Sequence, residues 1–153
     1  MKLIPLTQGK FTKVDDDDFE KLKKYKWHYH KKGYAERKSN NKHIKMHRQI
    51  LGLTHGDKKQ GDHRDRQKLN NQKNNLRICT NLENSANRNS RKNSTSEYLG
   101  VCFCKKENKW KAQICKNYKI IRIGAFKTEI EAALAYNKKA IEIHGEFANL
   151  NFK

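Results

Sequence analysis

Apolar residues are scarce in this chain. Of its 153 residues, 35% are hydrophobic and 9% aromatic, and the mean hydropathy is -1.13. This composition leaves too little material for one large core, so we expect one ordinary domain or two very small ones. No apolar run approaches a membrane span, and the apolar part of the opening MKLIPLTQGK is too short for a signal peptide. These absences predict a soluble, intracellular protein with no membrane partner.

Paired cysteines are also lacking. Cys79, Cys102, Cys104 and Cys115 contain no CxxC pair, so neither a zinc ribbon nor a disulfide framework is indicated. Free thiols fit a reducing compartment, and the expected location is therefore cytoplasmic.

Acidic residues are outnumbered by basic ones. The chain carries 35 Lys and Arg against 16 Asp and Glu, a formal net charge of +19. Residues 1–60 hold 16 basic and 7 acidic side chains (+9), and residues 61–153 hold 19 and 9 (+10), so both halves share the excess. This charge indicates a polyanionic partner: DNA, RNA or an anionic membrane face. A basic surface that serves only solubility is the plainer alternative.

Short strands and one helix are expected over residues 9–52. GKFTKV alternates as a strand does, DDDDFEKLKKY opens with acids that suit a helix N-terminus, and WHYHKKGYAER is expected to turn at Gly33. KHIKMHRQILGL adds a strand and an apolar turn. Further on, Thr80 and Glu83 in TNLE predict a capping box and a helix that runs to about residue 90. The basic stretch 85–96 reads as a linker, whose charges either follow a phosphate backbone or keep it solvated.

From Tyr98 the pattern becomes that of a half-buried sheet followed by a helix. Apolar residues at every second position predict three short strands. KTEIEAALAYNKKAIEIHG then predicts a helix that ends at Gly145 and buries Ile130, Ala133, Leu134, Ala140 and Ile141. The opposite face of the sheet is expected to present Cys102, Cys104, Lys111, Gln113, Cys115 and Arg122.

This C-terminal segment resembles a known DNA-binding domain. YLGVCFCKKENKWKAQICKNYKIIRIGAFKTEIEAALAYNKKAIEIHGEFANLNF is similar to the Apetala-two (ethylene-response-factor) domain of plants in its G-V opening, G-x-F, A-A-x-A-Y helix and closing N-x-N-F. The resemblance implies that the exposed sheet face enters the major groove of double-stranded DNA. Cysteines and Ile120 stand where the family usually has arginine or tryptophan, so we expect modest base specificity from Arg122, Gln113 and Lys111. Phosphate contacts are expected from Lys105, Lys106, Lys116 and Lys119.

GDHRDRQKLNNQKNNLRICTNLEN carries a second resemblance. Asn75 and Asn84 follow His63 by twelve and twenty-one residues, and LNNQKNNLRICTNLEN is similar to the asparagine-rich HNH motif of phage homing endonucleases. The preceding segments IPLTQGKFTKVDDDDF, YKWHYH, GYAER and MHRQI also resemble phage-type members. Gly61 departs from the family by replacing an apolar residue, and Arg66-Gln67 by replacing a Gly-Asn pair. Both departures leave reduced or altered activity open.

The resemblance implies a set of roles that suits phosphodiester hydrolysis. His63 is expected to be the general base, and Asn75 to hold its imidazole. Strand alternation points Asp62 away from His63, so Asp62 and Asn84 are expected to bind one divalent ion, magnesium or manganese. Asn70, Asn71 and Asn74 are expected to shape the loop, and His47 to be structural. DNA contacts are expected from Arg48, Arg77, Arg88, Arg91 and Lys92. No motif supports a role for His28, His30, His43, His55 or His144.

Together these patterns predict an α+β fold. Residues 1–84 would form strands, a helix and a ββα-metal nuclease module with its motif at 61–84. Residues 85–96 would form the linker, and 97–153 a three-stranded antiparallel sheet backed by one helix. The expected function is a homing-type DNA endonuclease of a phage or bacterial cell, leaving 5′-phosphate and 3′-hydroxyl ends. A non-cutting DNA-binding protein and a basic RNA-binding protein remain alternatives. A single site favours nicking by a monomer, whereas double-strand cleavage would need a dimer or a second binding event.

Overall fold

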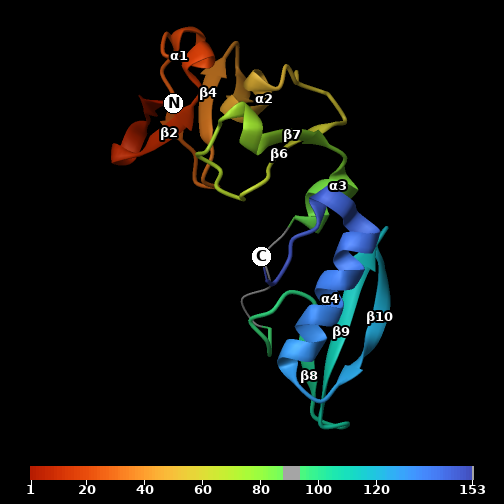
Figure 1. Cartoon of the computed structure of the whole chain (residues 1–153). Helices are drawn as coiled ribbons and strands as arrows, with labels where there is room; N and C mark the ends of the chain where they lie inside the picture. Colours follow the sequence, from red (N-terminus) through yellow and green to blue (C-terminus); the bar gives the residue numbers. More distant parts are fainter. Residues whose placement is uncertain (88–93, 153) are drawn as a thin grey trace. The chain divides into compact units, whose positions relative to one another are not determined.

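A computed structural model describes residues 1–87 and 94–152 of the chain (Figure 1). The chain divides into two compact units, Met1–Asn84 and Ser85–Lys153. Both units mix helices with small antiparallel sheets, which confirms the predicted α+β class. No helix within the described residues is long and apolar enough to cross a membrane.

The first unit begins with a two-stranded sheet and a short helix. Strands β1 (Lys2–Pro5) and β2 (Phe11–Val14) flank the 3-10 turn η1 (Thr7–Gly9), and helix α1 (Asp16–Leu22) follows. Three aspartates, Asp16, Asp17 and Asp18, occupy the first turn of α1, where negative charge stabilises the helix dipole. The predicted strand and helix of this region are therefore confirmed.

A three-stranded sheet comes next, in the order β3 (His28–Tyr29), β4 (Ala35–Ser39), β5 (Lys42–Lys45). The turn between β3 and β4 contains Gly33, as expected. Helix α2 (Met46–Ile50) follows β5 where the sequence predicted only an apolar turn. The unit packs around one apolar cluster, which consists of Ile4, Leu6, Val14, Leu22, Trp27, Ala35 and Met46.

The last part of this unit is a β-hairpin. Strands β6 (Gln60–His63) and β7 (Leu76–Cys79) pair antiparallel, and the 3-10 turn η2 (Lys73–Asn75) leads into β7. Helix α3 (Asn81–Ala86) follows directly. The predicted capping box is present, because Thr80 N donates to Glu83 Oε2 at 2.7 Å and Glu83 N donates to Thr80 Oγ1 at 3.3 Å.

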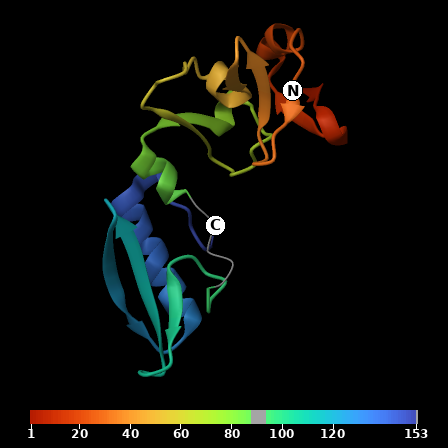
Figure 2. The same cartoon turned by 180° about the vertical axis from the view of Figure 1, so that it is seen from behind.

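The second unit is the predicted sheet and helix. Strands β8 (Val101–Cys104), β9 (Lys109–Lys116) and β10 (Lys119–Phe126) form an antiparallel sheet in the order β10-β9-β8. Helix α4 (Glu129–His144) and the 3-10 turn η3 (Gly145–Phe147) follow. Figure 1 shows α4 across one face of the sheet, and Figure 2 shows the opposite face.

The buried face of α4 matches the predicted one only in part. Ile130, Leu134 and Ile141 are 57%, 54% and 55% exposed, so their predicted burial was wrong. Ala133 and Ala140 are buried as predicted, and Ala132 and Tyr136 are buried with them. Alanines let the helix axis come close to the sheet. At Gly100 a β-carbon would lie 2.2 Å from Tyr136 Cδ2, so only glycine fits beneath the ring.

Candidate functional site

The β6–β7 hairpin has two faces with different chemistry. Register pairs Asp62 with Arg77 and His63 with Leu76. Directly paired residues point to the same side of a sheet and neighbours along a strand to opposite sides. Asp62 and His63 therefore belong to opposite faces, as the sequence predicted.

His63 lies in a buried aromatic environment. Its side chain is 4% exposed, and its ring centroid lies 4.9 Å from that of His47 and 6.2 Å from that of Tyr34. Burial lowers the pKa of His63, although the hydrogen bond with Asn71 opposes that shift. Burial also lowers the pKa of His47, to about 3. Both imidazoles are therefore neutral at pH 7.

A chain of hydrogen bonds fixes the tautomer of His63. The single hydroxyl hydrogen of Thr12 goes to Leu69 O at 2.8 Å. Thr12 Oγ1 can then only accept from Asn71 Nδ2, at 2.7 Å, which turns Asn71 Oδ1 toward His63 Nε2 at 3.1 Å. Because Oδ1 only accepts, Nε2 carries the proton and Nδ1 carries the lone pair of the neutral ring.

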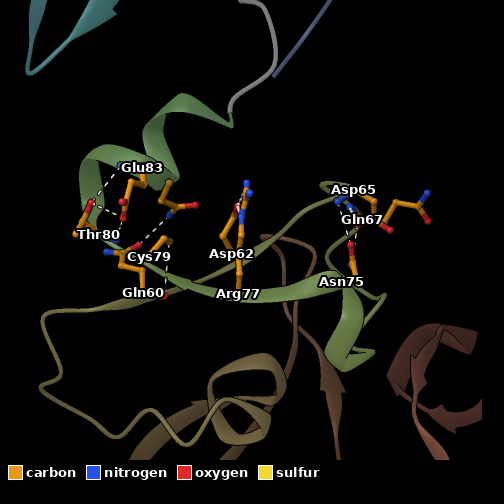
Figure 3. Close-up of polar contacts among 10 residues, drawn as sticks. Gln60, Asp62, Asp65, Gln67, Asn75, Arg77, Cys79, Thr80 and Glu83 are labelled. Atoms are coloured by element: carbon orange, nitrogen blue, oxygen red, sulfur yellow. Dashed lines mark hydrogen bonds and ion pairs between the residues drawn. The ribbon is translucent and has the colours of Figure 1, made fainter. Parts of the chain in front are cut away.

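Asn75 does not make the contact that the sequence assigned to it. Its amide nitrogen donates to Asp65 Oδ1 at 2.9 Å and to Asn70 O at 2.8 Å, and its oxygen accepts from Asp65 N at 3.0 Å. Asn75 thereby closes the loop between the hairpin strands (Figure 3). The contact with the His63 ring comes from Asn71, which the sequence had grouped with the residues that only shape the loop.

Asp65 is the centre of that loop. Its carboxylate accepts from Gln67 N, Asn70 Nδ2 and Asn75 Nδ2, at 2.7 to 2.9 Å. Burial alone would raise the pKa of Asp65, but these donors outweigh it and the net shift is downward. Arg66 beside it has a φ of 63°, a conformation that favours glycine, which is the residue the family pattern has here.

Asp62 forms a buried ion pair on the other face. Arg77 Nε donates to Asp62 Oδ2 at 2.8 Å, and a second guanidinium nitrogen lies 2.8 Å from the same oxygen. The two side chains are 8% and 7% exposed. The cross-strand pairing therefore places Arg77 against Asp62 (Figure 3), whereas the sequence assigned Arg77 a contact with DNA.

The Asn84 side chain lies on the same face of the hairpin as Asp62. Its Nδ2 donates to Gln60 Oε1 at 2.9 Å, and Gln60 and Asp62 share a face because they are two residues apart on β6. This bond uses the amide nitrogen of Asn84, so the oxygen is the atom available to a cation. One carboxylate and one amide oxygen are hard donors, which fits magnesium or manganese.

Gly61 is explained by its packing. A β-carbon at this position would lie 2.7 Å from His47 Cδ2 and 2.9 Å from Leu51 Cδ1. The departure from an apolar residue thus makes room for His47, whose ring packs on His63.

The remaining predicted DNA contacts divide into three groups. Arg48 is engaged within its own unit, since its guanidinium donates to Lys59 O at 3.0 Å and Thr54 O at 2.6 Å. Arg88, Arg91 and Lys92 lie outside the described residues. The sheet contributes the exposed Gln113, Lys116 and Arg122, together with Lys111, which forms an ion pair with Glu107.

The exposed sheet face has the composition that strand alternation predicted. Val101, Ala112 and Ile114 are buried toward α4. Register places Gln113 directly beside Arg122, and Lys111 beside Cys102. Guanidinium, amide and ammonium groups therefore gather on one side of a narrow sheet.

Fold and site define a basic protein of mixed α and β structure, in which a histidine-bearing hairpin leads into a capped helix. Over 153 residues the chain is 37% identical to an uncharacterized HNH endonuclease of Acanthamoeba polyphaga mimivirus, and the match covers 97% of this chain and 79% of that protein. The chain belongs to the HNH endonuclease family. No protein-family model matches it.

A second similarity covers part of the chain. It is 36% identical over 58 residues to APETALA2-like protein 2 of Oryza sativa subsp. indica, which is 38% of this chain and 13% of that protein. It is also 33% identical over 61 residues to an AP2-like ethylene-responsive transcription factor of Arabidopsis thaliana, which is 40% of this chain and 13% of that protein. Both predicted resemblances, to HNH endonucleases and to the Apetala-two domain, are thus found in the comparison with known proteins.

Proposed function

We propose that the chain is a metal-dependent DNA endonuclease in which His63 is the general base. One observation carries the proposal: in a chain of the HNH endonuclease family, the imidazole of His63 is neutral and held in one tautomer by Asn71 and Thr12. Phosphodiester hydrolysis requires a deprotonated water, and a neutral imidazole can take that proton. Attack at phosphorus with loss of the 3′ oxygen leaves 5′-phosphate and 3′-hydroxyl ends.

In this proposal the reacting atom of His63 is Nδ1. Since Nε2 donates to Asn71, Nδ1 is the atom that accepts the proton of the attacking water. The lowered pKa keeps this nitrogen unprotonated at neutral pH. Asn71 acts as the positioning residue, and Asn75 keeps the loop closed around it.

Asp62 and Asn84 would hold the divalent ion, magnesium or manganese, through their side-chain oxygens. Bound there, the ion supplies positive charge to the phosphate and help for the departing oxygen. Arg77 contacts Asp62 Oδ2 in the structure, so an ion that bound this oxygen would compete with Arg77. The DNA itself would be held by the sheet face with Lys111, Gln113 and Arg122, and by the exposed Lys116 at the end of β9.

Cleavage of a supercoiled plasmid library that carries random inserts tests the proposal. We expect magnesium-dependent conversion to open-circle or linear DNA, and the product form gives the number of strands cut. His63→Ala should lower the rate by about 10² to 10⁴ while leaving DNA affinity unchanged. Asn71→Ala should lower the rate by about 10 to 100. His55→Ala, which alters an exposed histidine outside the site, should change neither quantity.

Two results would contradict this mechanism. Cleavage that survives His63→Ala would remove His63 from the reaction. Retarded DNA without cleavage, with magnesium or with manganese, would favour the second candidate function, a DNA-binding protein that does not cut. The Asp62–Arg77 ion pair is the observation that favours this second candidate, because Arg77 contacts one carboxylate oxygen of the proposed metal ligand.

A further inference from the structure

Three side chains of the β3–β4–β5 sheet converge on one point. His28 Nε2 lies 3.5 Å and His43 Nδ1 lies 2.6 Å from the same atom, Glu36 Oε1. The three candidate ligand atoms all lie within 4.8 Å of one another. The Glu36 side chain is 4% exposed, whereas those of His28 and His43 are 37% and 63% exposed. A buried carboxylate is thus covered by two imidazoles that solvent can reach.

The register of the sheet produces this convergence. His28 on β3 pairs directly with Glu36 on β4. His43 on β5 pairs with Lys38, two residues beyond Glu36, so it is a diagonal neighbour of Glu36 on the same face. Each of three adjacent strands therefore contributes one group, and a bond to all three groups would tie the strands together.

We propose that His28, Glu36 and His43 bind one transition-metal ion, with zinc the best match. Two imidazole nitrogens and one carboxylate oxygen are a donor set that zinc accepts and magnesium does not favour. In a tetrahedral zinc site, bonds of about 2.0–2.1 Å separate neighbouring ligand atoms by about 3.3 Å. The pair His28–Glu36, at 3.5 Å, is close to this separation. The pair His43–Glu36 has to lengthen, which the exposed His43 ring can do by rotation, and a water would complete the site.

The carboxylate is in the charge state that a cation requires. Burial alone would raise the pKa of Glu36, but the hydrogen bond with His43 and the nearby imidazoles of His30, His43 and His28 outweigh it, so the net shift is downward. His30 itself is not a ligand, because its Nδ1 accepts from Lys32 N at 3.2 Å, which leaves the ring proton on Nε2.

This site is independent of the proposed nuclease chemistry. The proposed catalytic ion has only oxygen donors, from Asp62 and Asn84, whereas the sheet site offers two nitrogens. A large excess of magnesium should therefore fill the oxygen site without blocking zinc at the imidazoles.

Calorimetric titration of the full chain with zinc, in excess magnesium, tests the proposal. Thiols are zinc ligands, and those of Cys102, Cys104 and Cys115 are exposed or half-exposed, so the experiment uses the triple serine variant as its background. We expect one zinc per chain and a higher melting temperature with zinc than without. His43→Gln should weaken binding on the order of tenfold or more and remove that thermal shift.

The control is His55→Gln, an exposed histidine outside the cluster, which should bind zinc as the background protein does. His43 is chosen because its side chain is mostly exposed, so its replacement leaves the core intact. Equal zinc affinity in His43→Gln and the background protein would overturn the proposal. So would the absence of zinc binding in the background, which would leave the cluster as a plain hydrogen-bonded ion pair.

Discussion

His47 and His63 are two buried imidazoles packed edge to face, and both are held neutral by their surroundings. An unfolded chain exposes them to water, where a histidine has a pKa near 6.5. A group whose pKa is lower in the folded state binds fewer protons there. The folded protein therefore loses stability as the pH falls below 6.5, and for His47 this loss continues until the pH reaches about 3.

Replacing His47 with phenylalanine should flatten this pH dependence. By proton linkage, His47 alone makes the wild type about 1 to 2 kcal/mol less stable at pH 5 than at pH 7. The variant lacks that contribution, so its unfolding free energy should fall less over the same interval. Urea unfolding at several pH values between 5 and 7 measures both curves. Parallel curves would show that folding does not lower the pKa of His47.

The residue that forms the hydrogen bond with the His63 ring could not be predicted from the sequence. Asn70, Asn71, Asn74 and Asn75 fall within six positions, and nothing local distinguishes their roles. The choice of Asn71 depends on Thr12, which lies 59 positions away and accepts from its amide. The pairing of Asp62 with Arg77 was likewise readable only from strand register. The presence of Asp62 and His63 on opposite faces, in contrast, needed only strand alternation.

At the scale of elements, the hairpin is built tightly against α2. Gly61 on β6 has no space for a side chain beside His47 and Leu51. The sequence showed that Gly61 departs from the family pattern and left reduced or altered activity open. The structure explains the departure by packing, since the His47 ring fills the space that a side chain at Gly61 would take.

Gly61→Ala should destabilise the protein. The added β-carbon, 2.7 Å from His47 Cδ2, forces the ring or the strand to shift, at a cost of about 1 to 3 kcal/mol. Urea unfolding of Gly61→Ala, His47→Ala and the double variant gives the coupling between the two positions. The double variant should be more stable than the sum of the single effects predicts, because His47→Ala frees the space. If Gly61→Ala alone instead raised the free energy of unfolding by about 0.4 to 1 kcal/mol, the neighbouring side chains would have moved to accept the β-carbon without strain.

Helix α4 shows where periodicity alone misleads. The large apolar residues Ile130, Leu134 and Ile141 form one stripe on the helix surface. The helix packs on the sheet through the adjacent stripe, which consists of alanines and Tyr136. The close packing that alanines allow between helix and sheet stabilises the unit more than burial of the larger side chains would. Tyr136 fills the space above Gly100. The strands and the helix themselves were predictable, because their boundaries depend on local alternation, the Thr128–Glu131 capping box and Gly145.

At the scale of the whole molecule, positive charge is spread over both halves of the sequence. Under the proposed function, each half has a different task on DNA, cleavage by the first unit and binding by the sheet of the second. Phosphate contacts contribute affinity that falls with salt, whereas contacts to base edges contribute sequence preference. Variants in the second unit should therefore change binding without changing the chemistry at His63.

Arg122→Ala tests this division. Arg122 is exposed and lies beside Gln113 on the sheet face, where its guanidinium can reach a base edge in the major groove. Its loss should weaken binding of a selected DNA site by about 1 to 3 kcal/mol and relax the sequence preference. Lys116→Ala should instead weaken binding to all sequences alike and reduce the slope of log affinity against log salt by about 1.

Gel retardation at several salt concentrations measures both effects. Lys138→Ala, on the exposed side of α4, is the matched control and should leave affinity and slope unchanged. If Arg122→Ala binds like the control, the sheet face does not contact DNA, and the binding surface must be sought on the first unit.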